Sequence, residues 1–526
     1  LAKIPLNPNG KVDRKALPLP EYGRSVSDAA FIAPRTAMET NIAAIWTDVL
    51  EIEQVSIDDN FFDLGGESFK AIRVVRQIGE AISVMDLFKY PTIRELAHYL
   101  AQDEPKQDGL LHELTRRSAQ PKTRALVCVP FGGASAIVFQ PLAQALPPDY
   151  ALYSVQIPGH DFACREEHLR PMPEVARQCA AEIMATVDGP VALYGHCVGG
   201  AMAVEIARLL EDAGREVDAV FLGGTFPSPR LPGKLFEWVS RSRQRRSNRA
   251  TFDFLRMLGG FSEGLDPAEQ DFMLAGLRHD VQEVEDYYTE AYAAPLAKKL
   301  QAPIVSIVGE MDRVAEFYEE RYLEWTYFTD LVSLETIPLA GHYFLKHQAG
   351  ALAEIINNRL DGAATAVFPA PDAPIAKTKL KTFFTVAIGQ LVSLIGTNLT
   401  TFALSIWALE QTGQLSEFAL INVFGRLPAI LFAPLAGAIA DKYDRRLVMI
   451  LSDVLAALST VAAALLFWTD TLQVWHLYVT ATLGSISTTF QEPAYTAAIT
   501  QLIPKRYLGH ANGIVQFGSA TGRMFA

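Results

Sequence analysis

Two residues of this 526-residue chain stand in turns that suit covalent chemistry. Ser68 follows two glycines and precedes an apolar helical stretch, so the free N–H groups at the start of that helix face any anion esterified to the serine. Gly-Gly-Glu-Ser alone is also typical of a plain turn and helix cap. Cys197 lies in Gly195-His196-Cys197-Val198-Gly199, the G-x-S-x-G elbow with cysteine in place of serine. The patterns predict a phosphate ester at Ser68 and an acyl-accepting nucleophile at Cys197.

The region around Cys197 predicts the elements that position it. Short apolar strands alternate with helical stretches through residues 124–360, which indicates a mostly parallel α/β sheet. The expected strands are residues 124–130, 150–157, 191–194, 217–223, 304–309 and 331–337. Oxyanion stabilisation is expected from the N–H of Val198 and from an N–H of the loop that begins at Phe131. An insertion at about 227–300 is expected to form a lid.

The stretch 59–68 resembles the carrier-protein motif of nonribosomal peptide synthetases, in which the serine bears a 4′-phosphopantetheine arm. Residues 34–103 fit that family, including Pro34-Arg35-Thr36 and residues 86–93. The resemblance implies an all-α four-helix carrier domain, modified on Ser68 by a phosphopantetheinyl transferase. The helix after Ser68 is about one turn shorter than expected for the family.

Residues 4–15 resemble the last motif of amino-acid adenylation domains, in which Lys11 meets the adenylate and the amino-acid carboxylate. Residues 1–20 are therefore expected to be the C-terminal stub of such a domain. This implies upstream synthetase domains, and we expect the chain to be a fragment.

Residues 124–360 resemble the thioesterase domains that end nonribosomal peptide assembly lines, which implies an α/β-hydrolase domain with Cys197 as nucleophile. The resemblance places the catalytic histidine at His342, with His196 as scaffolding and His347 as a bystander. Many of these thioesterases carry the acid where this chain has glycine, near Gly224. Asp312, after the next strand, is the expected acid. The alternatives are that Asp312 only caps a turn or that no acid is needed, because a thiol loses its proton more readily than a hydroxyl.

Charge and cysteine usage exclude some functions. The net charge of −13 and the lack of a basic stripe with aromatic residues argue against nucleic acid as a partner. The four cysteines have neither metal-ligand spacing nor a disulfide framework, so no metal is expected and a reducing cytosol fits best. The basic run 241–249 predicts a solvated helix face, or else a surface for anionic lipid or for the acidic carrier residues Asp58, Asp59, Asp63 and Glu67.

The composition changes sharply near residue 377. Residues 382–409 contain no Asp, Glu, Lys or Arg, and further spans are expected at 418–440, 447–469 and 473–500. Residues 101–123 and 361–376 are typical of linkers. Arg426 and Asp453 fall within spans and are expected to face a cavity or each other.

The loop between the second and third spans resembles the cytoplasmic signature of major facilitator superfamily transporters. The residues that carry the resemblance are Gly437, Asp441, Arg445 and Arg446. It implies that residues 380–526 are the N-terminal part of such a transporter. Basic residues recur at 377–381, 442–446 and 505–506, so the positive-inside rule places the carrier and thioesterase in the cytoplasm, beside the inner membrane.

Together these features predict a multidomain chain: an adenylation stub, a carrier, a cysteine thioesterase and the first helices of an exporter. A peptidyl thioester on Ser68 is expected to pass to Cys197 and to leave by hydrolysis or cyclisation. The alternative is a membrane-tethered carrier scaffold with an editing or inactive thioesterase.

Overall fold

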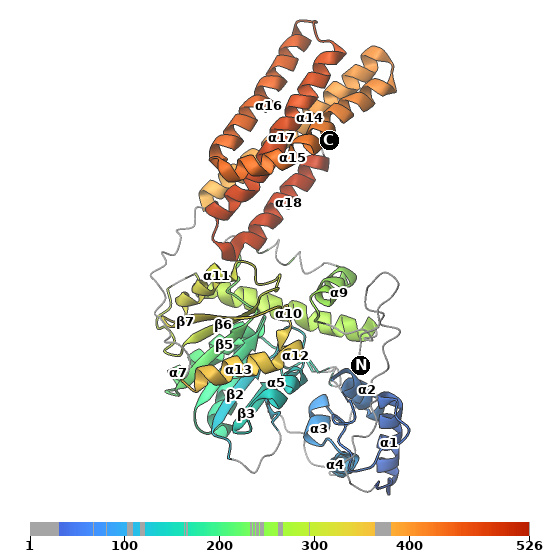
Figure 1. Cartoon of the computed structure of the whole chain (residues 1–526), viewed down its shortest axis with the longest axis vertical. Helices are drawn as coiled ribbons and strands as arrows, with labels where there is room; N and C mark the ends of the chain where they lie inside the picture. The colour runs from blue at the N-terminus through green and yellow to red at the C-terminus, as the bar shows by residue number, and fades with distance from the viewer. Residues whose placement is uncertain are drawn as a thin grey trace, which may run out of the picture.

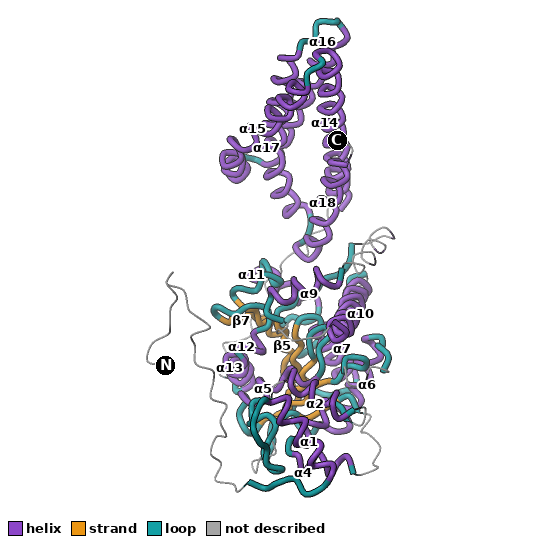
Figure 2. The backbone as a smooth tube through the Cα atoms, turned by 90° about the vertical axis from the view of Figure 1, so that its right-hand side faces the viewer, coloured by secondary structure: helices purple, strands orange, loops and turns teal. Residues whose placement is uncertain are grey.

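The computed structural model describes residues 31–66, 68–79, 82–101, 109–115, 121–161, 164, 167–231, 234, 237, 241, 247–260, 267–293, 295–362 and 380–524. Three parts follow one another along the chain: a small helical part, an α/β part and a bundle of long helices (Figure 1). Figure 2 shows that the strands are confined to the middle part. The stub with Lys11 and nearly all of the linker 361–376 lie outside the described residues.

The first part consists of four helices, α1 (Ala37–Leu50), α2 (Ser68–Ile78), α3 (Val84–Lys89) and α4 (Ile93–Leu100). Capping boxes begin two of them: Thr36 with Glu39 at α1, and Ser83 with Asp86 at α3. The helices enclose a core in which the fully buried Trp46 packs edge-on against Phe61, with ring centroids 5.0 Å apart. The all-α four-helix fold expected of the carrier is confirmed.

The α/β part is built on a seven-stranded sheet in the order β1-β3-β2-β4-β5-β6-β7. Its strands are β1 (Leu111–Glu113), β2 (Arg124–Val129), β3 (Tyr150–Val155), β4 (Val191–His196), β5 (Val217–Gly223), β6 (Ile304–Gly309) and β7 (Val332–Ile337). All neighbouring pairs are parallel except β1 with β3. The expected α/β sheet is therefore present, and each of the six expected strands forms within a few residues of its expected bounds.

Successive side chains of a strand point to opposite faces of the sheet, so an apolar strand gives both faces an apolar surface. Helices cover both of these faces. From β2, Leu126 and Cys128 enter one core, whereas Val127 and Val129 enter the other. Helices α5 (Gln140–Ala145), α12 (Phe344–His347) and α13 (Ala349–Leu360) pack on the first face, and α6 (Met172–Thr186) and α7 (Gly199–Asp212) on the second. Both faces of the sheet are buried by helices, which explains why the parallel strands are almost wholly apolar.

The expectation that residues 101–123 form a linker throughout is wrong. Residues 111–113 pair antiparallel with β3 as the edge strand β1, with Leu111 opposite Val155. Leu110 and Leu114 on either side are buried. A three-residue strand carries too little periodicity to be predicted, and its stability comes from the strand beside it.

The insertion after β5 contains α9 (Asn248–Met257) and the long helix α10 (Pro267–Ala291). Figure 1 shows α10 running along the side of the α/β part that faces the helical bundle. Beyond β6 follow α11 (Tyr318–Arg321) and the short helical turn η3 (Tyr322–Tyr327). The expected lid is thus dominated by one helix, α10.

The last part contains α14 (Leu380–Thr412), α15 (Leu415–Lys442), α16 (Arg445–Trp468), α17 (Val474–Leu502) and α18 (Leu508–Met524), with the turn η4 (Lys505–Tyr507) before α18. In the described residues, three stretches are long and apolar enough to cross a membrane: Thr382–Thr412, Leu415–Ile439 and Arg445–Trp468. The expected fourth span forms α17, but its Ser and Thr residues, with Glu492, lower its mean hydropathy below that of the other three. At 29 residues, α17 is nevertheless long enough to cross a bilayer.

Arg426 and Asp453 do not pair. The Asp453 carboxylate accepts a hydrogen bond of 2.7 Å from the Gln491 side chain of α17, whereas Arg426 is exposed. A neutral amide on a neighbouring helix therefore serves as the partner of Asp453 in place of Arg426.

Candidate functional site

Cys197 sits on a strained turn directly after β4. Its φ of 54° lies in the left-handed region, and its N–H donates to the Gly223 carbonyl at 2.8 Å. The flanking glycines are required sterically. A Cβ on Gly195 would lie 2.5 Å from the Gly199 carbonyl oxygen, and one on Gly199 would lie 2.3 Å from that of Pro130. The backbone thus presents the cysteine at the carboxyl edge of the sheet, as in a nucleophile elbow.

His342 and Asp312 form a buried pair beside this turn. His342 Nδ1 lies 2.8 Å from Asp312 Oδ2, and the two residues are only 3% and 6% exposed. Burial lowers the pKa of His342, but the charge on Cys197 and the hydrogen bonds with Asp312 and Cys197 outweigh it and raise the pKa to about 10. The arrangement favours an imidazolium held between a carboxylate and a sulfur.

The other position at which related thioesterases carry the acid is occupied here by a glycine, which has no side chain. Gly224 has a φ of 60°, and a Cβ there would lie 3.1 Å from His342 Nδ1 and 3.2 Å from Asp312 Oδ2. Any side chain at this position would be strained and would crowd the pair. The structure therefore brings Asp312, from the turn after β6, to the histidine.

The two expected oxyanion donors flank the nucleophile. Val198 precedes α7, and Phe131 follows β2. Within the described chain, neither amide donates a backbone hydrogen bond outside a helix or strand, whereas the nearby Gly133 N–H donates to Asp280 Oδ2 at 3.0 Å. The assignment of these two N–H groups to an oxyanion hole stays a prediction.

His196 belongs to a second, wholly buried network. One ring nitrogen lies 2.8 Å from the Tyr194 hydroxyl and the other 3.0 Å from the His342 carbonyl oxygen. Burial, together with the nearby His342, holds the pKa of His196 well below its ordinary value, so the ring stays neutral. His196 therefore positions the backbone of His342. His347 is the last residue of α12, and its side chain is exposed.

The sequence reasoning missed a third buried pair, which joins the lid to the oxyanion side. Asp280 on α10 accepts from Gly133 N–H, and its same oxygen lies 2.8 Å from His160 Nε2. Burial lowers the pKa of His160, but the hydrogen bond and the charge of Asp280, with smaller effects of the Pro158 carbonyl and Glu167, together outweigh it and raise the pKa. Gly133 lets the lid approach, since a Cβ there would lie 2.4 Å from the Met273 carbonyl oxygen. The position of His160 after a strand was the only signal that the sequence offered.

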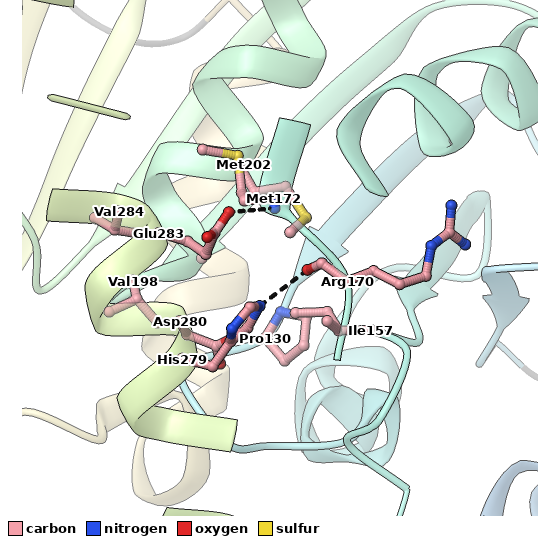
Figure 3. Close-up of a pocket in the computed structure, with 11 residues that line it drawn as sticks. Pro130, Ile157, Arg170, Met172, Val198, Met202, His279, Asp280, Glu283 and Val284 are labelled. Atoms are coloured by element: carbon pink, nitrogen blue, oxygen red, sulfur yellow. Dashed lines mark hydrogen bonds between the residues drawn. The ribbon is translucent and has the colours of Figure 1, made fainter. Parts of the chain in front are cut away.

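A small pocket opens beside this contact (Figure 3). It lies between α10 and the ends of β2 and β3, and its lining is mainly apolar. Two hydrogen bonds to α10 close its rim: Met172 N–H donates to Glu283 at 2.8 Å, and His279 Nε2 lies 3.0 Å from the Arg170 carbonyl. The lining residues are Pro130, Ile157, Arg170, Met172, Val198, Gly199, Met202, His279, Asp280, Glu283 and Val284.

Ser68 is the first residue of α2, so the N–H groups of the first turn lack helical partners. The turn before it is closely packed. Gly65 has a φ of 87°, and a Cβ on Gly66 would lie 2.4 Å from the Phe61 ring. These features fit a phosphodiester on the serine, because the glycines bring the backbone close and the helix start favours negative charge.

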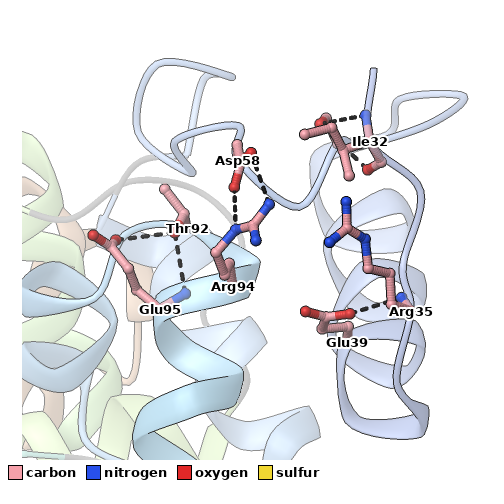
Figure 4. A network of polar contacts seen from close by, with 8 residues as sticks. Ile32, Arg35, Glu39, Asp58, Thr92, Arg94 and Glu95 are labelled. Atoms are coloured by element: carbon pink, nitrogen blue, oxygen red, sulfur yellow. Dashed lines mark hydrogen bonds and ion pairs between the residues drawn. The ribbon is translucent and has the colours of Figure 1, made fainter. Parts of the chain in front are cut away.

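The acidic carrier residues are partly engaged within the carrier. Asp58 receives two hydrogen bonds from Arg94, at 2.6 and 3.0 Å (Figure 4), and the hydrogen bond with Arg94 lowers the pKa of Asp58. Asp59 accepts from Ser56 N–H at 2.9 Å. In the basic run 241–249, residues 242–246 lie outside the described chain, as does Glu67, and Arg241 pairs with Glu237 at 2.7 Å. The proposed contact between these surfaces stays a prediction.

The transporter signature spans the junction of α15 and α16. Gly437 and Asp441 lie near the end of α15, and Arg445 and Arg446 begin α16. Arg445 Nη1 donates to the Ala497 carbonyl of α17 at 2.9 Å. This contact fastens the start of α16 to its neighbour, as the Asp/Arg pattern predicts for a latch between helices.

Three families match successive parts of the chain. "Phosphopantetheine attachment site" matches residues 41–100, "Thioesterase domain" residues 124–359, and "Transmembrane secretion effector" residues 371–523. The Bacillus subtilis dimodular nonribosomal peptide synthase is 32% identical over 44% of this chain and 10% of its own length. A linear gramicidin synthase polypeptide from Brevibacillus parabrevis is 49% identical over 19% of this chain and 2% of its own length. The chain thus spans a tenth or less of these relatives.

Among solved structures, the type II thioesterase BorB from the borrelidin cluster is 29% identical, with a TM-score of 0.40 over 49% of this chain and 100% of that one. The family matches and the relatives confirm the resemblances of the carrier, the thioesterase and the transporter region. The chain joins a carrier domain and a thioesterase domain, both similar to parts of nonribosomal peptide synthetases, to a region of a major-facilitator-type transporter. Its carrier is of the kind that holds 4′-phosphopantetheine covalently, and its middle part is a thioesterase.

Proposed function

We propose that the chain releases a peptide from its own carrier through a cysteine acyl-enzyme. A phosphopantetheinyl transferase attaches the arm to Ser68, and upstream synthetase domains deliver the peptide to it as a thioester. The Cys197 thiolate attacks the thioester carbonyl, and His342 gives its proton to the sulfur of the arm, which leaves as a thiol. Neutral His342 then takes a proton from water or from a nucleophile within the peptide as it attacks the acyl-enzyme, and Cys197 leaves as the thiolate.

One observation carries this proposal: a cysteine at positive φ on an elbow stands beside a buried histidine that contacts a carboxylate at 2.8 Å. A cysteine held only for structure would need neither the strained turn nor the ion pair. Cys128 shows the contrast, since it is fully buried in β2 and burial raises its pKa well above the ordinary value. A neutral thiol in such a place is a poor nucleophile.

Several features support transfer from the carrier to this site. Helix α2, which Ser68 begins, meets the lid helix through an ion pair of 3.9 Å between Arg76 and Glu269. The amides of Val198 and Phe131 are assigned to the oxyanion of each tetrahedral intermediate. The apolar pocket below α10 suits an apolar side chain of the acyl group. Release by cyclisation is favoured over hydrolysis, because a thioester acyl-enzyme reacts more readily with an amine than an oxoester does.

The second candidate is a membrane-tethered carrier scaffold whose thioesterase edits misprimed arms or is inactive. The restricted size of the pocket favours editing, which would select short acyl groups, whereas product release would select the full peptide. The intact ion pair of His342 argues against an inactive site. In either case we propose that both domains face the cytoplasm at the inner membrane and that the peptide leaves through the transporter.

Mass spectrometry of the intact protein tests the main proposal. A phosphopantetheinyl transferase with coenzyme A is expected to add one phosphopantetheine to the wild type and none to Ser68→Ala. A peptidyl thioester is then expected to acylate the wild type and not Cys197→Ala. Cys164→Ala is the matched control, since both cysteines are half-buried. Acylation that survives in Cys197→Ala would refute the nucleophile.

A further inference from the structure

The basic turn η4 between α17 and α18 contacts the thioesterase. The Arg506 guanidinium lies 4.6 Å from the centre of the Tyr292 ring, and Lys505 lies 4.8 Å from that of Phe317. Lys505 also forms an ion pair with Glu320. In both Figure 1 and Figure 2, the lower end of α18 approaches α11, which agrees with these contacts.

The buried carboxylate of Glu324 stabilises the contact between the turn η4 and the thioesterase. Its side chain is 13% exposed, and its carboxylate meets Arg321 at 3.3 Å. Burial raises the pKa of Glu324, while Arg321 and then Arg506, by its charge and a backbone hydrogen bond, act in the opposite direction. Each cation that faces a buried carboxylate stabilises its charge, so Arg506 adds to the effect of Arg321 on Glu324.

An apolar contact accompanies the charges. Leu231, which belongs to the segment after β5, is 1% exposed and packs in a cluster with residues of the helical bundle. Its buried partners are Phe383, Ile499, Ile503, Tyr507, Leu508 and Ala511. The surface therefore has an apolar centre and a charged rim, which is the anatomy of a specific interface.

We propose that this face of the thioesterase is a docking surface for the transporter's own basic turn, Lys505–Tyr507. Charge complementarity selects the occupant: residues 316–324 carry Glu316, Glu319, Glu320 and Glu324, and the turn presents Lys505 and Arg506. The other basic loop, at 442–446, is engaged within the bundle through Arg445 and Ala497. The positive-inside rule also places residues 505–506 on the thioesterase side of the membrane.

Docking here would connect release to export. Tyr292 directly follows α10, the helix whose Asp280 holds the Gly133 loop beside Cys197. The transporter turn therefore contacts the residue directly after α10, the helix that covers the active site. The peptide is set free next to the cytoplasmic face of the exporter, so that it need not diffuse to it.

Crosslinking of the full chain in membrane vesicles tests this surface without relying on catalysis. The background replaces Cys128, Cys164 and Cys179 with alanine and Cys197 with serine, and it carries a protease site within residues 363–379. Glu320→Cys with Lys505→Cys is treated with a short bismaleimide, and cleavage then reveals whether the two halves remain joined. Glu320→Cys with Lys442→Cys is the matched control from the other basic loop.

The first pair is expected to crosslink at least ~10-fold faster than the control pair. Adding Arg506→Glu is expected to slow it several-fold, and adding Arg446→Glu to leave it unchanged. Hydrogen exchange in a chain that keeps its cysteines gives a second reading: residues 317–327 should exchange faster in Arg506→Glu than in Arg446→Glu. Equal crosslinking of both pairs, or equal exchange in both variants, overturns the docking surface and leaves the acyl-transfer proposal standing.

Discussion

Replacing Asp312 with asparagine removes the carboxylate that faces His342 but keeps the shape of the side chain. Both residues are nearly fully buried, so water cannot replace the lost charge. The pKa of His342 rises from 6.5 to about 10, which corresponds to roughly 5 kcal/mol of preference for the imidazolium at ~1.4 kcal/mol per pH unit. Cys197 and Asp312 share this effect. Removing one partner of a buried charge pair costs roughly 3 kcal/mol, which corresponds to ~10²-fold in acylation.

The measurement is the single-turnover acylation of Cys197 by a peptidyl thioester as a function of pH. His342 carries a raised pKa, so its proton is retained up to about pH 10 and lost above it. The wild-type rate is therefore expected to fall at high pH near 10, when the imidazolium disappears. In Asp312→Asn this descending limb should move to lower pH, together with the lower rate.

Glu310→Gln is the matched control, because Glu310 lies in the same turn and accepts from Leu339 N–H at 3.0 Å without meeting the imidazole. It should keep both the rate and the limb near pH 10. If Asp312→Asn behaves like this control, Asp312 does not orient the histidine, and the assignment of the acid is wrong.

Three further outcomes are expected. Cys197→Ser should lose cyclised product more than hydrolysed product by chromatography with mass detection, and equal losses would count against the thioester argument. Asp280→Asn should lower kcat about 10-fold with little change in KM, because it loosens the oxyanion loop. Asp286→Asn, on the same helix but outside the pocket lining, removes a carboxylate that accepts from Gln282 and should leave kcat unchanged. In intact cells, an impermeant maleimide should label Gln414→Cys but not Lys505→Cys, and the reverse pattern would place the thioesterase outside.

The structure follows the sequence-based expectation at the elbow, where the signal is local. Cys197 and its flanking glycines lie within five residues, so the need of the turn for small residues can be recognised from the sequence. The order of strands and helices also follows from periodicity, because each buried strand is a separate apolar run. The strand β1 was not predicted, because it is too short to show an alternation of apolar residues and forms only by pairing with β3.

The pairing of distant groups required the fold. Asp280 and His160 are 120 residues apart, and nothing in either neighbourhood indicates that they share a proton beside the oxyanion loop. The same holds for Asp453, whose partner proved to be Gln491 and not Arg426. Such pairs depend on which helix packs against which loop, a choice made by side-chain packing over the whole domain.

The sequence alone determined which chemical groups this protein holds and in what order: a serine at a helix start, a cysteine on an elbow, a late histidine and apolar spans with basic loops. These depend on residue types within one turn or one element. Only the tertiary structure decided that Asp312 reaches His342 and that the turn at Lys505 meets Glu320. The reason is physical: a buried charge is tolerated only where folding supplies its partner, and that partner can come from anywhere in the chain.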